Sequence, residues 1–388
     1  MLKVLLTGGR VIDPSSGFDK IADVLVERGV IAAVGADLAA LHPDAETVDC
    51  AGLLVTPGLI DLHAHVFLGL GDFCVAPDRA GIDTGVPVVV DGGTSGVATF
   101  GLARNWIEAS EPATRVLAWM DPCQLYLATG DFICHKLRIA DDTRNLDLDS
   151  TAAALDEHAE MVIGFKVRAT HVGDDTRSPF LDGAQAIAGD RRPVMVHLGR
   201  FPHTPSITNE ALLTTLRSGD VITHAFRAGG GQLDPNSGAV TPEFAEAVER
   251  GVRLDVGHSA TDFRYRTARR LFDAGYLPDS ISTDLNAFNA DTPVGSLPET
   301  MSKVWALGVD LVDVIKMATL GPATSIRRDY ELGSLAVGRP AEISVLRIEE
   351  GPVELSDGHE TITAARRLVG AGCVRAGSWM AVPELMPA

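Results

Sequence analysis

From Leu53 onward, runs of apolar residues alternate with amphipathic segments along the chain. The apolar runs are predicted to be strands, and there are eight: 54–62, 88–90, 116–120, 161–167, 194–197, 221–225, 252–256 and 281–284. The amphipathic segments predict helices at 104–110, 150–160, 183–188, 209–218, 241–250, 261–274 and 298–307. Continuous apolar strands that alternate with helices indicate a parallel sheet, and eight of them predict a closed (β/α)8 TIM barrel. An open doubly wound sheet is the alternative, but no GxGxxG follows the early strands.

The two ends of the chain have a different pattern. Residues 2–55 are short β-branched runs broken by turns, which predicts a small antiparallel sheet. After Asp310 we expect two helices with a break near Gly321-Pro322, followed by strand-like runs that could complete the first sheet. We therefore predict a small β-sandwich domain from residues 1–56 and 334–388, and a barrel domain from residues 57–333. Residues 141–149 and 173–179 are predicted to be surface loops, the second of which could cover the barrel mouth.

Composition and charge narrow the function classes. Hydrophobic residues make up 46% of the 388 residues and charged residues 22%, as in soluble globular proteins. The net charge of -19 repels phosphate backbones, so we expect no nucleic-acid partner. No apolar run is long enough to span a bilayer, and Met1–Arg10 does not resemble a signal peptide, so we expect no membrane partner. Five scattered cysteines fit a reducing cytoplasm. A small-molecule substrate is expected; a homo-oligomer would be unsurprising, although no residue pattern requires it.

Metal-binding side chains stand where the predicted strands end. His63 and His65 are two residues apart on one strand and therefore point to the same face. The ends of the later strands add further groups, namely Lys166, His197, His224 and Asp284. In a barrel of this kind the carboxyl ends of the strands form the active-site rim, so the pattern predicts a metal site there. The remaining histidines in loops or helices are interpreted as solvated (His42, His135, His158, His359).

Lys166 is open to three interpretations. A buried lysine at a strand end is costly unless it is paired or neutral. It could form an ion pair, for instance with Asp284; it could be a Schiff-base lysine; or it could become an oxygen ligand of a metal.

The order HxH, Lys, His, His, Asp on successive strands resembles the amidohydrolase superfamily of metal-dependent hydrolases. The flanking sequences match as well, namely Val55-Thr56-Pro57-Gly58-Leu59-Ile60-Asp61, Asp91-Gly92-Gly93-Thr94-Ser95-Gly96 and Gly333-Ser334-Leu335-Ala336-Val337-Gly338-Arg339-Pro340-Ala341-Glu342. The resemblance implies a centre of two zinc ions, bridged by a carboxylated Lys166 and a hydroxide. It assigns His63, His65 and Asp284 to the first metal and His197 and His224 to the second. Glu342 replaces the aspartate common in the last motif, a change expected at the surface.

Within the superfamily, the chain is most similar to the dihydroorotase-like deacetylase branch. The likeness rests on Gly164-Phe165-Lys166-Val167-Arg168, Val194-Met195-Val196-His197, Thr223-His224-Ala225-Phe226, Asp255-Val256-Gly257-His258 and Ile281-Ser282-Thr283-Asp284-Leu285. It implies deacetylation of a small carboxylate-bearing substrate, an N-acetyl amino acid or an O-acetyl 2-hydroxy acid such as acetylmandelate. A cyclic amidase of the dihydroorotase or hydantoinase type is the alternative, but dihydroorotases carry an arginine after HxH where this chain has Val66 and Phe67. A metal-free binding protein on the same scaffold is a third reading; such descendants typically lose ligands.

Asp284 is the predicted catalytic residue, as the general base that takes a proton from the attacking water and returns it to the leaving group. Three residues are candidates for binding the substrate: Arg168, which shares a strand face with Lys166, His258 at the end of the seventh run, and Asn286, two residues after Asp284. For Arg168 an ion pair with a neighbouring carboxylate is an equal alternative. His258 could instead be structural, and His171 and His203 are expected to be incidental.

Overall fold

Seven strands form a parallel sheet in the computed structural model, which describes residues 3–170, 176–199 and 203–383. Their order is β12-β11-β10-β9-β8-β7-β6, and every neighbouring pair is parallel. Their bounds are β6 (Ile60–Ala64), β7 (Val88–Gly96), β8 (Arg115–Asp121), β9 (Val162–Val167), β10 (Val194–His197), β11 (Val221–Thr223) and β12 (Arg253–Leu254). The run at 88–90 therefore belongs to a nine-residue strand, β7.

The prediction of an eighth regular strand at 281–284 is wrong. Segment 280–285 lies between the two edges of the sheet but contributes only two isolated parallel bridges, Asp255↔Ser280 and Ala64↔Leu285. Two features explain the irregularity. The Thr283 amide donates to the Asp61 carboxylate at 3.1 Å instead of to a neighbouring strand, and Asp284 has a left-handed backbone with φ of 51°. A complete eight-stranded barrel is therefore not formed by regular strands, although the curled sheet brings its edges together.

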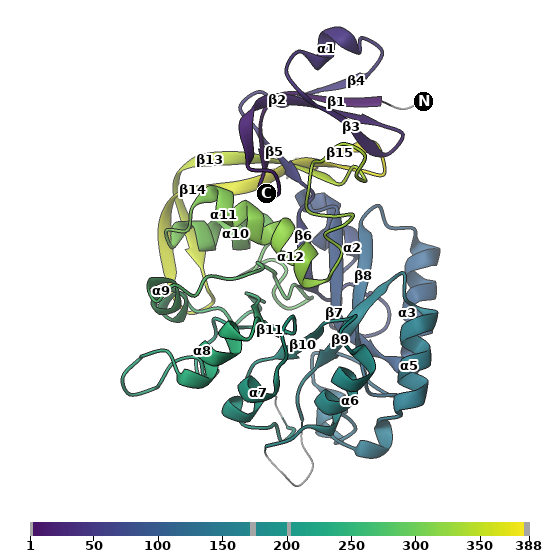
Figure 1. Ribbon diagram of the computed structural model, residues 1–388, viewed down its shortest axis with the longest axis vertical. Helices are drawn as coiled ribbons and strands as arrows, with labels where there is room; N and C mark the ends of the chain where they lie inside the picture. The colour runs from purple at the N-terminus through teal and green to yellow at the C-terminus, as the bar shows by residue number, and fades with distance from the viewer. Residues whose placement is uncertain (1–2, 171–175, 200–202, 384–388) are drawn as a thin grey trace.

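Helices cover the outer face of this sheet (Figure 1). Their bounds are α2 (Pro77–Ala80), α3 (Val97–Ser110), α4 (Ile133–Lys136), α5 (Leu148–Glu157), α6 (Pro179–Ala188), α7 (Asn209–Thr215), α8 (Pro242–Glu249), α9 (Tyr265–Asp273), α10 (Leu297–Ala306), α11 (Leu311–Ala318) and α12 (Leu320–Ser325), with 3-10 turns η1 (Ile82–Thr84) and η2 (Thr143–Asn145). The last two helices are separated at Thr319. Proline would disrupt the interior of one continuous helix, whereas Pro322 is tolerated here because it lies in the first turn of α12. Of the predicted loops, 141–149 includes η2 and the start of α5; within 173–179, residues 173–175 lie outside the described part and Pro179 begins α6.

The two ends of the chain meet in a second sheet, drawn in purple and yellow in Figure 1. Its order is β15-β14-β13-β5-β1-β2-β3, with β4 paired to β1. The bounds are β1 (Lys3–Asp13), β2 (Phe18–Glu27), β3 (Val30–Gly35), β4 (Glu46–Asp49), β5 (Leu54–Pro57), β13 (Ile343–Ser356), β14 (Thr361–Arg375) and β15 (Ser378–Ala381), and the short helix α1 (Leu38–Leu41) follows β3. The carboxy-terminal strands thus complete the sheet that the amino-terminal strands begin, as expected, although the predicted β-sandwich is one continuously hydrogen-bonded sheet. It bends around its own core, where residues of β2 such as Val26 pack in one cluster with Val374 of β14.

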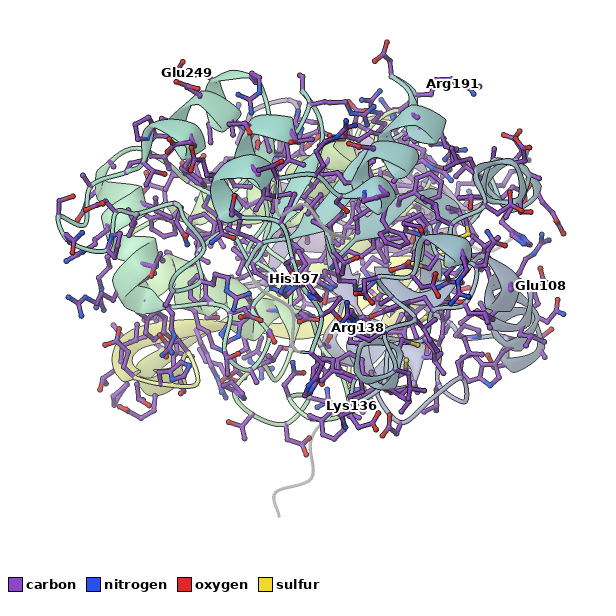
Figure 2. All side chains as sticks on the ribbon, turned by 90° about the horizontal axis from the view of Figure 1, so that it is seen from below. Glu108, Lys136, Arg138, Arg191, His197 and Glu249 are labelled. Atoms are coloured by element: carbon purple, nitrogen blue, oxygen red, sulfur yellow. The ribbon has the colours of Figure 1, made fainter. Side chains whose placement is uncertain are left out.

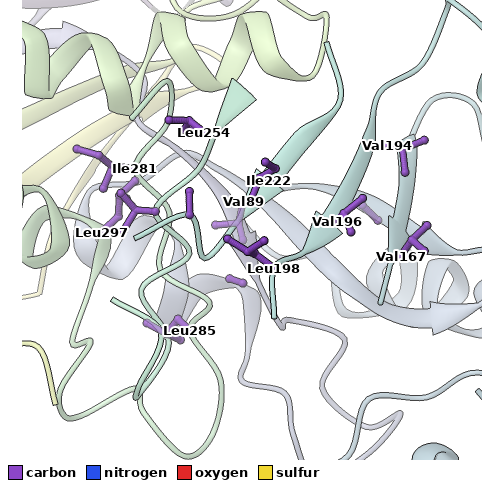
Figure 3. Packing of buried hydrophobic residues seen from close by; sticks show 14 of the residues in the cluster. Val89, Val167, Val194, Val196, Leu198, Ile222, Leu254, Ile281, Leu285 and Leu297 are labelled. Carbon is purple, nitrogen blue, oxygen red and sulfur yellow. The ribbon is translucent and has the colours of Figure 1, made fainter. Parts of the chain in front are cut away.

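Alternate residues of the parallel strands point to opposite faces of the sheet and form two apolar layers. One layer lies inside the curled sheet and includes Val88, Val90 and Met195; Ile326, just after α12, packs against it. The other lies between the strands and the helices, and Figure 3 shows part of it, including Val89, Val167 and Val196. Since Phe165 and Val167 face the outer layer, Lys166 and Arg168 must face inward. The strands thus aim their polar ends into the barrel mouth.

Glu342 is mostly buried between the two sheets, which corrects its expected surface position. Its Oε2 atom is buried and has no hydrogen-bond partner among the described residues. Burial raises the pKa of Glu342 from 4.5 to about 7, although Arg115 and Arg375 act in the opposite direction. The folded carboxyl therefore keeps its proton at a pH where the unfolded one has lost it.

We expect this group to make the protein less stable as the pH rises from 4.5 to 7, by roughly 2–3 kcal/mol in the free energy of unfolding. Glu342→Gln should remove that part of the pH dependence and leave the variant the more stable protein at pH 8. Urea unfolding of both proteins at several pH values tests this. Parallel stability curves for the two proteins would contradict it.

Candidate metal centre

Six side chains from the strand ends converge at the barrel mouth, as the sequence predicts. All six are buried: His63, His65, Lys166, His197, His224 and Asp284. Asp284 Oδ1 lies 3.3 Å from His63 Nε2 and 3.2 Å from His65 Nε2. Lys166 Nζ lies 2.9 Å from His63 Nε2.

The two remaining histidines complete the ring around the mouth. The rings of His197 and His224 are 4.6 Å apart, and those of His63 and His224 are 5.4 Å apart. One ligand atom each from His63, His224 and Asp284 lie within 4.8 Å of one another, a spacing that one cation could bridge. Figure 2 shows His197 near the middle of the molecule when viewed from below.

Backbone conformation and glycine make room for this ring. His224 and Asp284 both have left-handed backbones, which end the extended run and turn the side chains toward the mouth. A Cβ on Gly92 would lie 2.2 Å from the His63 ring, and one on Gly93 would lie 2.5 Å from Lys166 Cβ. The Gly-Gly pair of β7 therefore serves the close approach of two candidate ligands.

The protonation states suit a divalent cation. Burial lowers the pKa of His63 and His197 well below the usual value and also lowers that of His224, so these imidazoles are neutral at pH 7. Burial, with Arg168 nearby, lowers the pKa of Lys166 to about 7. Burial raises the pKa of Asp284, but the contact with His65 and the nearby His224 and Lys166 outweigh it, so the pKa is lowered and the carboxylate stays ionised.

The Oδ1 atom of Asp284 carries the strongest indication of a missing partner. It is buried, it is negatively charged, and it has no hydrogen-bond partner in the described structure. Burying an unpaired carboxylate oxygen is costly, whereas a cation between it and the imidazoles would satisfy it. The residues present therefore fit a metal ion.

Arg168 is engaged inside the protein. Its Nη1 donates to Asp121 Oδ2 at 2.6 Å and its Nη2 to the Gly93 carbonyl at 3.2 Å, and its guanidinium lies 4.1 Å from the centre of the Tyr126 ring. This is the ion pair that the sequence offered as the alternative to substrate binding. Its role toward a substrate stays a prediction.

Arg168→Gln is expected to lower the free energy of unfolding by about 3–5 kcal/mol, because it leaves the buried Asp121 carboxyl without its ion-pair partner. The double variant Arg168→Gln/Asp121→Asn should recover most of that loss. Chemical denaturation of the wild type, of the single variants Arg168→Gln and Asp121→Asn, and of the double variant measures the coupling. If the loss of unfolding free energy in the double variant equalled the sum of the losses in the two single variants, the ion pair would not be the source of the stability.

His258 and Asn286 also have partners within the chain. His258 Nδ1 lies 2.6 Å from the Ser259 carbonyl, and its Nε2 lies 3.1 Å from the buried Lys303 Nζ. Asn286 Nδ2 donates to the Asp284 carbonyl at 2.9 Å, so it supports the backbone of the candidate base. Substrate contacts by either residue remain predictions. The sequence gives no sign that Lys303 is buried beside His258, because it lies within a helix, where a lysine is ordinarily solvated.

Two histidines interpreted as solvated are in fact buried. His135 lies 2.8 Å from Thr204 Oγ1, and His158 packs against the Phe100 ring at 5.0 Å. Burial lowers the pKa of His135 to about 3. His203 is exposed, in accord with an incidental role, and His171 lies outside the described residues.

Comparisons with known proteins agree with this architecture. The model of the amidohydrolase family matches residues 236–365. A deacetylase of Agrobacterium fabrum is 31% identical over 370 residues, covering 94% of this chain and 88% of its own. A deacetylase of Brucella anthropi is 31% identical over 354 residues, covering 90% and 85%. Among solved structures, a dihydroorotase is 29% identical with a TM-score of 0.83, covering 98% of this chain and 99% of its own.

In the part of the chain that the structure describes, no helix combines the length and apolar character needed to cross a bilayer.

Proposed function

Because the chain belongs to the amidohydrolase family, we propose that it is a metal-dependent hydrolase that removes an acetyl group from a small carboxylate-bearing molecule, either an N-acetyl amino acid or an O-acetyl 2-hydroxy acid. The observation that carries this proposal is the buried Asp284 Oδ1, which, among the described residues, lacks a hydrogen-bond partner in a ring of four buried histidines and Lys166. The names of the two relatives that cover most of the chain support the acetyl group.

We further propose that two zinc ions occupy the ring. His63, His65 and Asp284 would hold the first and His197 and His224 the second, with Lys166 carboxylated on Nζ and shared by both. The lowered pKa of Lys166 supports this assignment, since only the neutral amine can attack CO2, losing a proton to form the carbamate. When bound, such ions activate water and polarise the scissile carbonyl.

The chain's own residues supply the proton transfers. The Asp284 carboxylate would accept a proton from the attacking water and deliver it to the leaving nitrogen or oxygen, so that one carboxylate serves as base and then as acid. Asn286 and Asn289 both donate to the Asp284 carbonyl, at 2.9 and 2.8 Å, and hold this residue in place. The apolar layer beneath the ring excludes water from the strand side of the site.

A substrate panel tests the proposal. Zinc-loaded protein is assayed with N-acetyl amino acids, O-acetyl 2-hydroxy acids, dihydroorotate and hydantoin, and chelator-treated protein is the control. Hydrolysis of acetylated acids that is lost on chelation supports deacetylation. Hydrolysis of the cyclic amides alone would replace it with the cyclic amidase, a candidate that the likeness to a solved dihydroorotase keeps in view.

The structure adds one argument against a dihydroorotase. Val66 and Phe67, which stand where that enzyme has its substrate-binding arginine, are completely buried in the apolar core. Neither position could present a cation to a substrate without loss of packing. The deacetylase therefore remains the function that the site supports best.

A further inference from the structure

Two threonine–aspartate pairs surround the candidate ligands. We propose that Thr223 with Asp255, and Thr94 with Asp91, are positioning residues that fix the rings of His63 and His65 so that both Nε2 atoms face the metal site. This inference rests on the proposed function in one respect, namely that the Nε2 atoms face a bound metal. The orientation itself concerns the protein alone.

The proton of the Thr223 hydroxyl determines which nitrogen of His63 carries hydrogen. Thr223 Oγ1 donates to Asp255 Oδ2 at 2.8 Å and lies 3.0 Å from His63 Nδ1. A hydroxyl has only one hydrogen, so once it donates to the carboxylate it can only accept from the histidine. His63 must then carry its proton on Nδ1, and its Nε2 lone pair faces the ring, where Lys166 Nζ donates to it.

His65 is held by the same device from the opposite side. Thr94 Oγ1 donates to Asp91 Oδ2 at 2.8 Å and lies 2.7 Å from His65 Nδ1. The proton of His65 is therefore on Nδ1 as well. Its Nε2 lone pair points toward Asp284 Oδ1, so two acceptors face each other at 3.2 Å with no hydrogen between them. A cation is what such an arrangement accommodates.

Both aspartates are rigidly bound. Asp255 accepts from three hydroxyls, those of Thr223, Ser280 and Ser282, at 2.6–2.8 Å, and is completely buried. Asp91 is completely buried too and accepts the backbone amides of Val66, Gly93 and Thr94. Because each carboxylate is held by at least three hydrogen bonds, turning it away from its threonine would break several of them. His224 has the same orientation through the backbone, with Nδ1 2.7 Å from the Gly257 carbonyl.

The Asp255 pair also joins two parts of the fold. Ser280 and Ser282 belong to the irregular segment that closes the sheet, where regular strand pairing is missing. Their hydroxyls bind the same carboxylate that aligns His63 through Thr223. One buried carboxylate therefore contacts both the segment that closes the sheet and the threonine beside a candidate ligand.

Thr223→Val and Thr94→Val test the inference, because valine keeps the shape of threonine and removes the hydroxyl. Thr319→Val is the control, since Thr319 is equally buried and donates only to the Ile315 carbonyl, away from the ring. Zinc affinity is measured by competition with a chromophoric chelator, and the histidine tautomers by nitrogen-15 NMR of the metal-free protein.

We expect each of the two variants to bind zinc about 10–100-fold more weakly and to lose the pure Nδ1–H tautomer of one histidine, while the control changes neither. Thr223→Ser should restore both, which separates positioning from a folding defect. Unchanged tautomers and unchanged zinc affinity in Thr223→Val and Thr94→Val would overturn the inference. If the wild type binds no zinc, the proposed function fails, yet the NMR measurement on the metal-free protein still decides the role of the threonines.

Discussion

Replacing Lys166 by alanine is expected to lower the bound zinc from about two equivalents per chain to less than one. Lys166 lies 2.9 Å from His63 Nε2 and faces into the ring, where its carbamate would be the group shared by the two ions. Without it, each ion would lose a charged ligand, and the remaining histidines alone would bind the ions less strongly. Elemental analysis of both proteins after zinc reconstitution in bicarbonate measures the change.

The control for this experiment is a second buried lysine. Lys303 is completely buried, and among the described residues its ammonium group has His258, the Pro293 carbonyl and Glu299 as polar partners, none of which belongs to the ring of six residues. Lys303→Met should therefore leave the zinc content at the wild-type value even if it lowers stability. A wild-type content near one equivalent, unchanged in Lys166→Ala, would mean a single-metal site and would return Lys166 to the ion pair or the Schiff base that the sequence left open.

Asp284→Asn is expected to reduce kcat by about 10²–10⁴-fold. The amide keeps the shape of the side chain and an oxygen near His63 and His65, but it cannot accept the proton from water at neutral pH. Steady-state assays with the best acetylated substrate measure kcat and KM, and elemental analysis shows how much metal the variant keeps. A variant that retains zinc and loses kcat identifies Asp284 as the proton carrier.

Asn286→Ala is the matched comparison for Asp284→Asn. Asn286 supports the Asp284 carbonyl together with Asn289, so its loss should lower kcat less than tenfold while one of the two hydrogen bonds remains. A rise in KM with unchanged kcat would instead support the predicted substrate contact of Asn286. Full activity of Asp284→Asn would remove Asp284 from the mechanism, whatever Asn286→Ala does.

The convergence of the candidate ligands was predictable because one geometric rule places them. Parallel strands end at the same edge of a sheet. Polar residues near the strand ends, such as His63, Lys166 and His197, must therefore meet at that edge. The pattern of apolar runs located these strand ends to within a few residues. The threonines and aspartates behind the ligands gave only a weak signal, namely polar residues such as Thr223 inside apolar runs.

The remaining differences arise from side-chain contacts that no local pattern encodes. Segment 280–285 keeps backbone hydrogen bonds to its neighbours, such as that of the Ser259 amide to the Thr283 carbonyl at 2.8 Å, but hydroxyl hydrogen bonds of Ser282 and Thr283 to buried aspartates accompany them and a regular ladder is not formed. The hairpin of β13 and β14 has a polar outer half that no apolar run marks, and this half finds support from the barrel, for example from the Tyr265 hydroxyl, which donates to the Leu355 carbonyl. The burial of Glu342 depends on two sheets meeting, which its own segment cannot reveal.

The sheet built from both chain ends also bears on how the protein is made. Strand β5 is hydrogen-bonded to β13, so that Thr56 and Ser344 are partners although 288 residues separate them. During synthesis at about 5–20 residues per second, the early strands would wait roughly 15–60 s for this partner to leave the ribosome. Throughout that interval β5 would present an unpaired edge, which makes the nascent amino-terminal segment the part of this protein that most needs protection by a chaperone.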